Sequence, residues 1–289
     1  MLSIAKFAQN PVSRLLLFIF GLLLLWVPTT LAWFLGTGWR PGIAFDKLAS
    51  YQLLGASIFL YIAIVSVLWW IAHRLDGGTL AQFGLVWDWK NLGLLLVGLG
   101  FGWVSLALLF SAELVFGWLS WKPEGLAHFG QFFFEGLLVG LAVAVVEELL
   151  FRGFIVHSIE RQYGVTVAWI GSALFFGVTH FIKAPEVIVA TWPQFPGLVV
   201  MGLVLAFARA KGGGRLGMCV GLHGGWVWSY YVINTLNLVA YNRPGIPQWL
   251  TGINGNPLAG LAGVVFLLVT AMAIAQIPVS KASTLETNL

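Results

Sequence analysis

The chain has 289 residues, of which 59% are hydrophobic and only 9% are charged, whereas about 25% of the residues in an ordinary soluble domain are charged. This composition excludes a soluble protein and predicts an all-α, polytopic integral membrane protein with one membrane domain over residues 1–289. The formal net charge of +4 is too small to indicate a nucleic-acid-binding protein, and the single cysteine, Cys219, excludes an internal disulfide.

Apolar runs of suitable length predict about eight transmembrane helices. In chain order they lie near residues 14–36, 52–73, 92–118, 134–156, 166–182, 196–210, 217–238 and 257–278. The fifth and sixth runs are short for a crossing, which takes about 20 residues. We interpret the first run as a retained span, because it is longer than the apolar core of a signal peptide.

An even number of spans places both termini on the same side of the membrane. If that side is cytoplasmic, ten of the 15 lysine and arginine residues lie in inner segments. The five cations in the outer loops are then Arg40, Lys47, Lys122, Lys183 and Arg243. The positive-inside rule therefore predicts that both termini are cytoplasmic. We expect the membrane to be an inner or plasma membrane of the bacterial type.

The fourth run contains charged residues, in the stretch VVEELLFRGF (145–154). On an α-helix Glu148 and Arg152 are four residues apart, about 40° around the axis, so they can form an ion pair. Glu147 lies about 100° from Glu148 and points elsewhere, where it could act as a general base in a cavity. The alternative is a buried ion-pair cluster that only holds two helices together.

Two later runs each contain a histidine. FFGVTHF (175–181) places His180 in the fifth run, and GLHGGWVW (221–228) places His223 in the seventh. A single histidine in a membrane helix is usually a packing residue. Two histidines together with an acidic pair, however, supply the groups that activate a water molecule.

These three stretches resemble the CPBP family of intramembrane proteases, which includes the Ras-converting CAAX protease and the bacterial Abi proteins. EELLFR matches the EExxxR motif of the family, and FGVTH, from Phe176 to His180, matches its FxxxH motif. HGGWV, from His223, occupies the third motif, so the resemblance covers about residues 134–238. It implies a glutamate-dependent endopeptidase whose active-site cavity lies inside the membrane.

The resemblance also implies roles for individual residues. Glu147 corresponds to the glutamate that activates water together with His180, and His223 corresponds to the histidine that helps to stabilise the oxyanion. Glu148 and Arg152 correspond to the supporting pair, and Phe176 is the first residue of the second motif.

The chain departs from the family pattern at Val227, where the family has a polar residue. Loss of one oxyanion donor costs about 10²–10³ in rate in an enzyme that uses it. Ser229 lies on roughly the opposite face of the helix, and Asn234 lies about 16 Å further along the axis. The indole N–H of Trp226 is the remaining local donor. Val227 therefore leaves open an altered or inactive enzyme.

The leading interpretation is an intramembrane endopeptidase without a cofactor, whose glutamate and histidine activate water. Its substrates would be membrane-anchored, lipidated or transmembrane proteins or peptides. One alternative is a zinc-dependent protease with Glu147, His180 and His223 as metal ligands. A second alternative is a non-catalytic membrane protein that binds peptides, for example in immunity.

Overall fold

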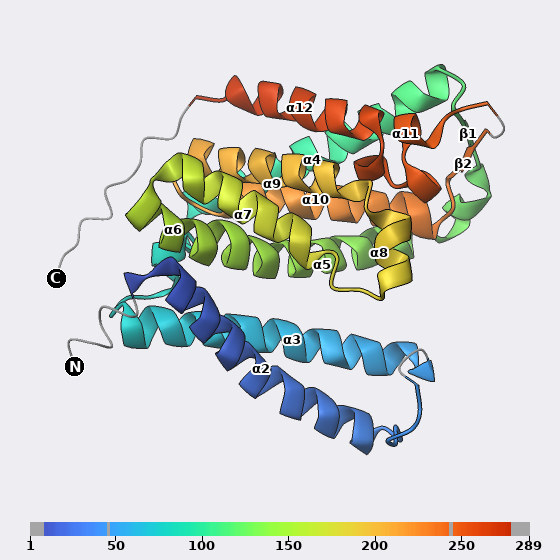
Figure 1. Cartoon of the computed structure of the whole chain (residues 1–289). Coiled ribbons are helices and arrows are strands. Elements are labelled where there is room, and N and C mark those ends of the chain that lie inside the picture. Colours follow the sequence, from blue (N-terminus) through green and yellow to red (C-terminus); the bar gives the residue numbers. More distant parts are fainter. Residues whose placement is uncertain (1–8, 45–46, 243–244, 279–289) are drawn as a thin grey trace. The chain divides into compact units, whose positions relative to one another are not determined.

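The computed structural model describes residues 9–44, 47–242 and 245–278, and most of these residues are helical (Figure 1). The all-α membrane fold that the composition predicts is confirmed. The chain separates into two compact units, residues 1–82 and residues 83–289. The predicted cytoplasmic placement of the termini concerns residues 1–8 and 279–289, which lie outside the described residues.

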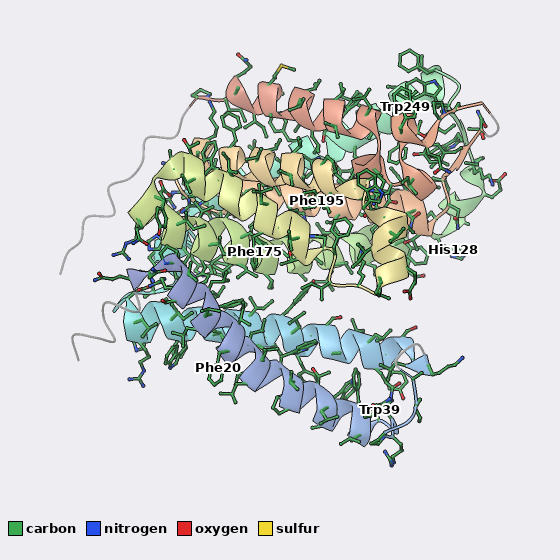
Figure 2. The ribbon with its side chains drawn as sticks, viewed as in Figure 1. Phe20, Trp39, His128, Phe175, Phe195 and Trp249 are labelled. Carbon is green, nitrogen blue, oxygen red and sulfur yellow. The ribbon has the colours of Figure 1, made fainter. Side chains whose placement is uncertain are left out.

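The first unit is a pair of long helices, α2 (Pro11–Gly36) and α3 (Ser50–Trp70). α3 continues into a π-helical turn, Ile71–Leu75. Asn10 begins α2, because its side-chain oxygen accepts a hydrogen bond from the free N–H group of Val12. The outer surface of this unit is apolar, as at Phe20, which is 65% exposed (Figure 2).

The second unit contains the remaining elements. Its helices are α4 (Trp89–Val115), α5 (Phe129–Glu148), α6 (Val156–Tyr163), α7 (Val165–Thr179), α8 (Pro185–Thr191), α9 (Gln194–Lys211), α10 (Gly217–Thr235), α11 (Gln248–Thr251) and α12 (Leu261–Ala275). A π-helical segment, Leu149–Ile155, joins α5 to α6 without a break in the helical chain. Two short strands, β1 (Leu119–Trp121) and β2 (Val239–Tyr241), pair in antiparallel fashion.

α10 runs through the middle of the second unit and contacts α4, α5 and α9 (Figure 1). Glycines allow the close approach on two sides. A Cβ atom at Gly225 would lie 2.7 Å from the carbonyl oxygen of Leu99 on α4, and one at Gly140 on α5 would lie 2.6 Å from that of Gly224. Small residues at such crossings let two helix backbones pack directly. This packing holds the side chains of α10 beside those of α5.

Each of the eight predicted runs corresponds to a helix within the described residues. The helices that are long and apolar enough to cross a membrane are Pro11–Gly36, Ser50–Leu75, Trp89–Val115, Pro123–Tyr163 and Gln194–Lys211. Val165–Thr179 and Leu261–Ala275 are apolar but shorter. α10 is missing from both sets, because its glycine, histidine, serine and asparagine residues lower its mean hydropathy. Most of α10 is buried, so protein rather than lipid surrounds much of its surface.

Candidate active site

The predicted pair of Glu148 and Arg152 is present and fully buried. Nη1 of Arg152 lies 2.9 Å from Oε1 of Glu148, and both side chains are 0% exposed. Glu148 is the last residue of α5, and Arg152 lies in the π-helical segment that follows. The wider π-helical turn, which the sequence analysis did not predict, still leaves these two side chains on neighbouring faces. π-Helical turns are rare and occur frequently at functional sites.

His223 joins this pair from α10. Its Nδ1 atom lies 2.8 Å from Oε1 of Glu148, and the histidine is only 3% exposed. A carboxylate oxygen accepts hydrogen bonds, so Nδ1 of His223 carries the hydrogen and donates it. Oε1 of Glu148 therefore accepts from Arg152 and from His223, while the other oxygen, Oε2, has no hydrogen-bond partner. Glu148 therefore fixes the position of His223 on α10 in addition to pairing with Arg152.

The guanidinium of Arg152 makes two further contacts across the bundle. Nη2 donates to the carbonyl oxygen of Gly202 on α9 at 3.2 Å, and Cζ lies 4.5 Å from the centre of the Phe176 ring. A Cβ atom at Gly202 would lie 2.9 Å from Ala173 and 3.3 Å from Nη2 of Arg152, so a larger residue would push the helix or the guanidinium away. The sequence analysis missed Gly202, whose only signal is a glycine within an apolar run.

Glu147 differs from Glu148, because no group among the described residues donates a hydrogen bond to its carboxylate. Its side chain is 24% exposed, and Oε2 has no hydrogen-bond partner. Oε2 lies 3.9 Å from Nε2 of His223, which is longer than a hydrogen bond. The two adjacent glutamates thus differ in their surroundings, as the helical spacing predicted. Glu148 is tied into a network, and Glu147 faces the other nitrogen of the same histidine.

His180 occupies a different position from the one predicted. The fifth run was expected to remain helical to residue 182, but α7 ends at Thr179 and His180 is its C-cap residue. Nδ1 of His180 lies 2.7 Å from the carbonyl oxygen of Phe176, which can only accept, so Nδ1 carries the hydrogen and Nε2 has the lone pair. This short bond turns the ring back over the last turn of α7.

The Phe176 ring links the two histidines. Its centre lies 4.5 Å from that of His180 and 6.1 Å from that of His223. Within the described residues, no hydrogen bond or ion pair connects His180 to Glu147 or to His223. The structure therefore gathers Glu147, Glu148, Arg152 and His223 by direct contact or close approach, and His180 through Phe176.

The residues of the zinc alternative are not arranged as a ligand set. Within the described ranges, no group of three or more histidine, cysteine, aspartate or glutamate residues is placed to hold a metal ion. Nδ1 of His180 and Nδ1 of His223 are both occupied by protein acceptors. Metal coordination by Glu147, His180 and His223 would thus have to use the Nε2 atoms and would require these side chains to move closer together.

The polar alternatives to Val227 are occupied elsewhere. The indole N–H of Trp226 donates to the Ser105 hydroxyl at 2.9 Å, so Trp226 is not a free donor. The hydroxyl of Ser229 donates to the carbonyl oxygen of Gly225 at 2.6 Å and is buried. Val227 itself lines an apolar cavity next to Trp226. In this structure no side chain takes the place of the missing polar residue within the described part of α10.

Residues 129–229 match the model of the family described as type II CAAX prenyl endopeptidase Rce1-like. The predicted family resemblance is confirmed. The Rce1-like segment begins with α5 and ends in α10, so it contains every residue of the site, while α4 and α12 lie outside it. No curated protein and no solved structure shows a significant match to the chain. Residues 129–229 are thus similar to a family of proteases, and the helices that are long and apolar enough to cross a membrane agree with a membrane protein.

Proposed function

We propose that the chain is an intramembrane endopeptidase in which Glu147 is the general base for water. The observation that carries this proposal is the contrast between the two adjacent glutamates. Glu148 is fully buried and accepts hydrogen bonds from Arg152 and His223, whereas Glu147 keeps an unpaired oxygen on a partly exposed side chain. A base needs a lone pair that is free to accept a proton from water. Oε2 of Glu147 is buried but bonded to no protein group, so its lone pair is open to a water molecule placed beside His223.

The first step would begin in the gap between Glu147 and His223. Oε2 and Nε2 are 3.9 Å apart, a separation that one water molecule spans with two hydrogen bonds of ordinary length, about 2.8 Å. Glu147 would take one proton from this water, and the hydroxide oxygen would form a bond to the carbonyl carbon of the substrate. The electron pair of the carbonyl bond would move to the oxygen, giving a tetrahedral oxyanion.

His223 is positioned to act on this oxyanion through Nε2. Its Nδ1–H is fixed by Glu148, so its ring presents Nε2 towards Glu147. With a hydrogen on both ring nitrogens of His223, Nε2–H would donate to the oxyanion. Glu147 is neutral at this stage, so the charges of Glu148, Arg152, His223 and the oxyanion sum to zero. A cluster without net charge is favoured in an apolar medium. When the C–N bond breaks, Glu147 returns its proton to the leaving nitrogen.

His180 would orient the attacking water. Its Nδ1 is bonded to Phe176, which leaves the lone pair of Nε2 as a hydrogen-bond acceptor. The His180 ring packs against the Phe176 ring, and the Phe176 ring also lies near His223 and Arg152. Nε2 of His180 would accept a hydrogen bond from one O–H group of the water, while Glu147 accepts from the other. A lone pair of the water oxygen would then face the carbonyl carbon of the substrate.

The substrates of this site would be membrane-anchored. The Rce1-like family description names CAAX prenyl endopeptidases, and a prenylated cysteine near a C-terminus is held in the bilayer by its lipid. An active site on transmembrane helices would be accessible to proteins that are anchored in the same bilayer. The enzyme would use no metal or other cofactor, would bind no nucleic acid, and would keep both termini in the cytoplasm of a bacterial-type cell.

The test is cleavage of membrane-anchored peptides, including prenylated CAAX peptides, by purified wild type and Glu147→Gln. The substitution keeps the size of the side chain and removes the base, so kcat should fall by about 10²–10⁴ without a change in folding. Glu135→Gln is the matched control, because Glu135 is an exposed carboxylate on the same helix. Undiminished cleavage by Glu147→Gln would contradict the mechanism. If the wild type binds these peptides but cleaves none, the non-catalytic alternative is favoured.

A further inference from the structure

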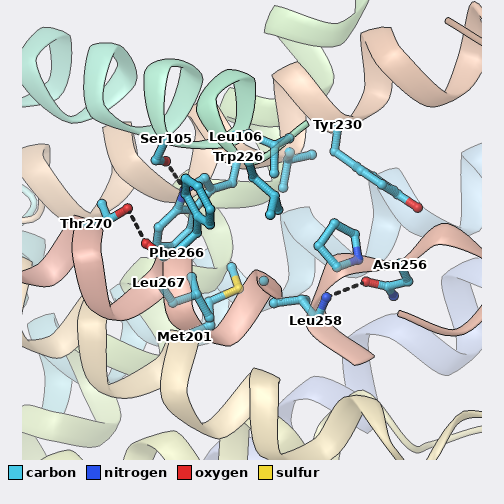
Figure 3. A pocket seen from close by; sticks show the side chains of 14 residues that line it. Ser105, Leu106, Met201, Trp226, Tyr230, Asn256, Leu258, Phe266, Leu267 and Thr270 are labelled. Atoms are coloured by element: carbon cyan, nitrogen blue, oxygen red, sulfur yellow. Dashed lines mark hydrogen bonds between the residues drawn. The ribbon is translucent and has the colours of Figure 1, made fainter. Parts of the chain in front are cut away.

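An apolar cavity of about 190 Å³ lies in the second unit, between α4, α9, α10 and α12 (Figure 3). Figure 3 shows Met201, Trp226 and Leu267 around it, with Leu106 on the far wall. Val227 also lines the cavity, and it is the residue at which the chain departs from the family pattern. The proposed mechanism makes no use of this cavity.

The cavity and the candidate active site share a face of α10. His223, Val227 and Tyr230 lie at helical offsets of zero, four and seven residues, so they fall within about 60° of one another around the axis. Val227 and Tyr230 line the cavity, and His223 lies one turn before them. On α9, Met201 lines the cavity, and its neighbour Gly202 accepts the hydrogen bond from Arg152. α9 and α10 thus each contribute residues both to the charged cluster and to the wall of the cavity.

Three polar side chains at the wall of the cavity are bonded within the protein, whereas the Tyr230 hydroxyl has no hydrogen-bond partner among the described residues. The Ser105 hydroxyl accepts from Trp226, and the Thr270 hydroxyl donates to the carbonyl oxygen of Phe266 (Figure 3). The Asn256 side-chain oxygen accepts from the N–H group of Leu258. With these groups engaged, the cavity offers a guest mainly dispersion contacts and the removal of apolar surface from water.

The size of the cavity limits what it can hold. An apolar protein cavity of about 150 Å³ holds one benzene molecule. A cavity of about 190 Å³ therefore accepts a group slightly larger than a benzene ring, such as one leucine, methionine or phenylalanine side chain. A prenyl chain is several times longer than a benzene ring, so only part of it would fit inside the cavity.

We propose that this cavity is the subsite for one large apolar side chain of the substrate beside the cleaved bond, with Val227 as its specificity-determining wall. This inference rests on the proposed endopeptidase function. Val227 is half-buried and gives this wall an apolar contact. The chain has an apolar contact where the family has a polar one.

The first arm of the test measures selectivity. A hydrophobic pocket discriminates by about 10–200-fold for one methylene group. The wild type should therefore favour peptides with leucine over alanine beside the cleaved bond by at least about tenfold in kcat/KM. Leu267→Phe and Val227→Phe narrow the cavity and should remove this preference. Leu268→Phe is the matched control, since Leu268 is the neighbouring residue on α12 and is 50% exposed.

The second arm needs no turnover, so it separates failure of the subsite from failure of the proposed function. In Glu147→Gln protein, a membrane-anchored peptide carrying a photoreactive leucine analogue should crosslink to Met201 or Leu267, and Leu267→Phe should abolish that crosslink. Crosslinking to these residues supports the subsite even if no peptide is cleaved.

Three outcomes would overturn the subsite. In the first, the preference for leucine is absent from the wild type or survives unchanged in both narrowed variants. In the second, peptide crosslinks lie only outside the cavity. In the third, a photoreactive phospholipid chain labels Met201 or Leu267 and the peptide does not, which makes the cavity a lipid site.

Discussion

Two buried ion pairs, Arg14 with Asp76 and Arg152 with Glu148, are built differently. In the first, both terminal nitrogens of Arg14 lie 2.7 Å from the two carboxylate oxygens of Asp76. Gln82 adds a third hydrogen bond to Asp76, at 3.1 Å. In the second, Arg152 bonds one oxygen of Glu148, and that oxygen is shared with a histidine from another helix. The first pair uses both carboxylate oxygens, and the second does not.

The difference separates a structural pair from a functional cluster. Oε2 of Glu148, Nε of Arg152 and Oε2 of Glu147 all lack a hydrogen-bond partner. A buried polar atom without a partner costs about 1–3 kcal/mol, so a cluster selected for stability alone would satisfy these atoms as Asp76 is satisfied. Such departures from good local bonding are expected at functional sites. The open cluster also lies within residues 129–229, which match the Rce1-like family model, whereas Arg14 and Asp76 lie outside them.

Arg152→Ala should have the largest effect on stability. It would leave Glu148 buried without its positive partner, at a cost of about 3–5 kcal/mol in the free energy of unfolding. The thermal unfolding midpoint of the purified protein should fall markedly, and activity should be lost with it. An Arg152→Ala protein as stable as the wild type would show that the pair contributes nothing.

Arg14→Ala sharpens the same comparison as a matched control. The Asp76 side chain is only 9% exposed, so this substitution should also lower the unfolding midpoint. The folded protein that remains should keep the kcat of the wild type, because Arg14 and Asp76 are not part of the candidate site. Equal loss of kcat in both arginine variants would remove the distinction between the two pairs.

His223→Ala should have the next largest effect, on the rate. It removes the proposed oxyanion donor, and loss of one such donor costs about 10²–10³ in kcat. Combining it with Glu147→Gln should add little, because residues that act as one unit are not additive. The measurement is kcat for the single and double variants, with His128→Ala, at an exposed histidine, as the control. Fully additive losses would place His223 outside the catalytic unit.

The local features of the site could be predicted from sequence. Glu148 and Arg152 are four residues apart on one helix, and helical spacing decides such pairs. The bond between His223 and Glu148 joins residues 75 positions apart, and the bond between Arg152 and Gly202 joins residues 50 positions apart. Residue spacing within one helix cannot predict contacts between different helices. Only the order of the three motifs indicated that the stretches around Glu148, His180 and His223 lie close together.

The fold shows the same division. Long apolar runs predicted the positions of the helices correctly, because hydrophobicity over about 20 residues is a property of composition. Among the described residues, five of these helices are long and apolar enough to cross a membrane, not the eight that were predicted. The three-residue strands β1 and β2 and the seven-residue helix α8 were missed, because they are too short to show a period. The pair of Arg14 and Asp76 was missed for the same reason as the bond of His223, since 62 positions separate its residues.

Asp88 provides a small, pH-dependent contrast with the buried pairs. The N–H group of Asn91 and the guanidinium of Arg215 bond its carboxylate, and they hold the pKa of Asp88 below its ordinary value of 3.8. A lowered pKa stabilises the folded state above pH 3.8, and this contribution is lost as the pH falls through the lowered value. Asp88→Asn should slightly flatten the acid side of a plot of unfolding midpoint against pH. A steeper acid slope would contradict this prediction.

Removal of metal ions should have the smallest effect. If water is activated by Glu147 alone, strong chelation should leave both cleavage and the unfolding midpoint unchanged, and elemental analysis should find no stoichiometric zinc. The control is a known zinc protease treated with the same chelator. Activity that is lost on chelation and restored only by zinc would favour the metalloprotease alternative.

The division of labour between the two adjacent glutamates is tested most directly by exchanging which of them is neutral. Glu147→Gln and Glu148→Gln differ by one position and remove the same charge, and each should be measured for both kcat and unfolding midpoint. We predict that Glu147→Gln lowers kcat by about 10²–10⁴ at an unchanged midpoint, while Glu148→Gln lowers the midpoint because Arg152 loses its buried, negatively charged partner. A lowered midpoint for Glu147→Gln together with an active, stable Glu148→Gln would contradict the account.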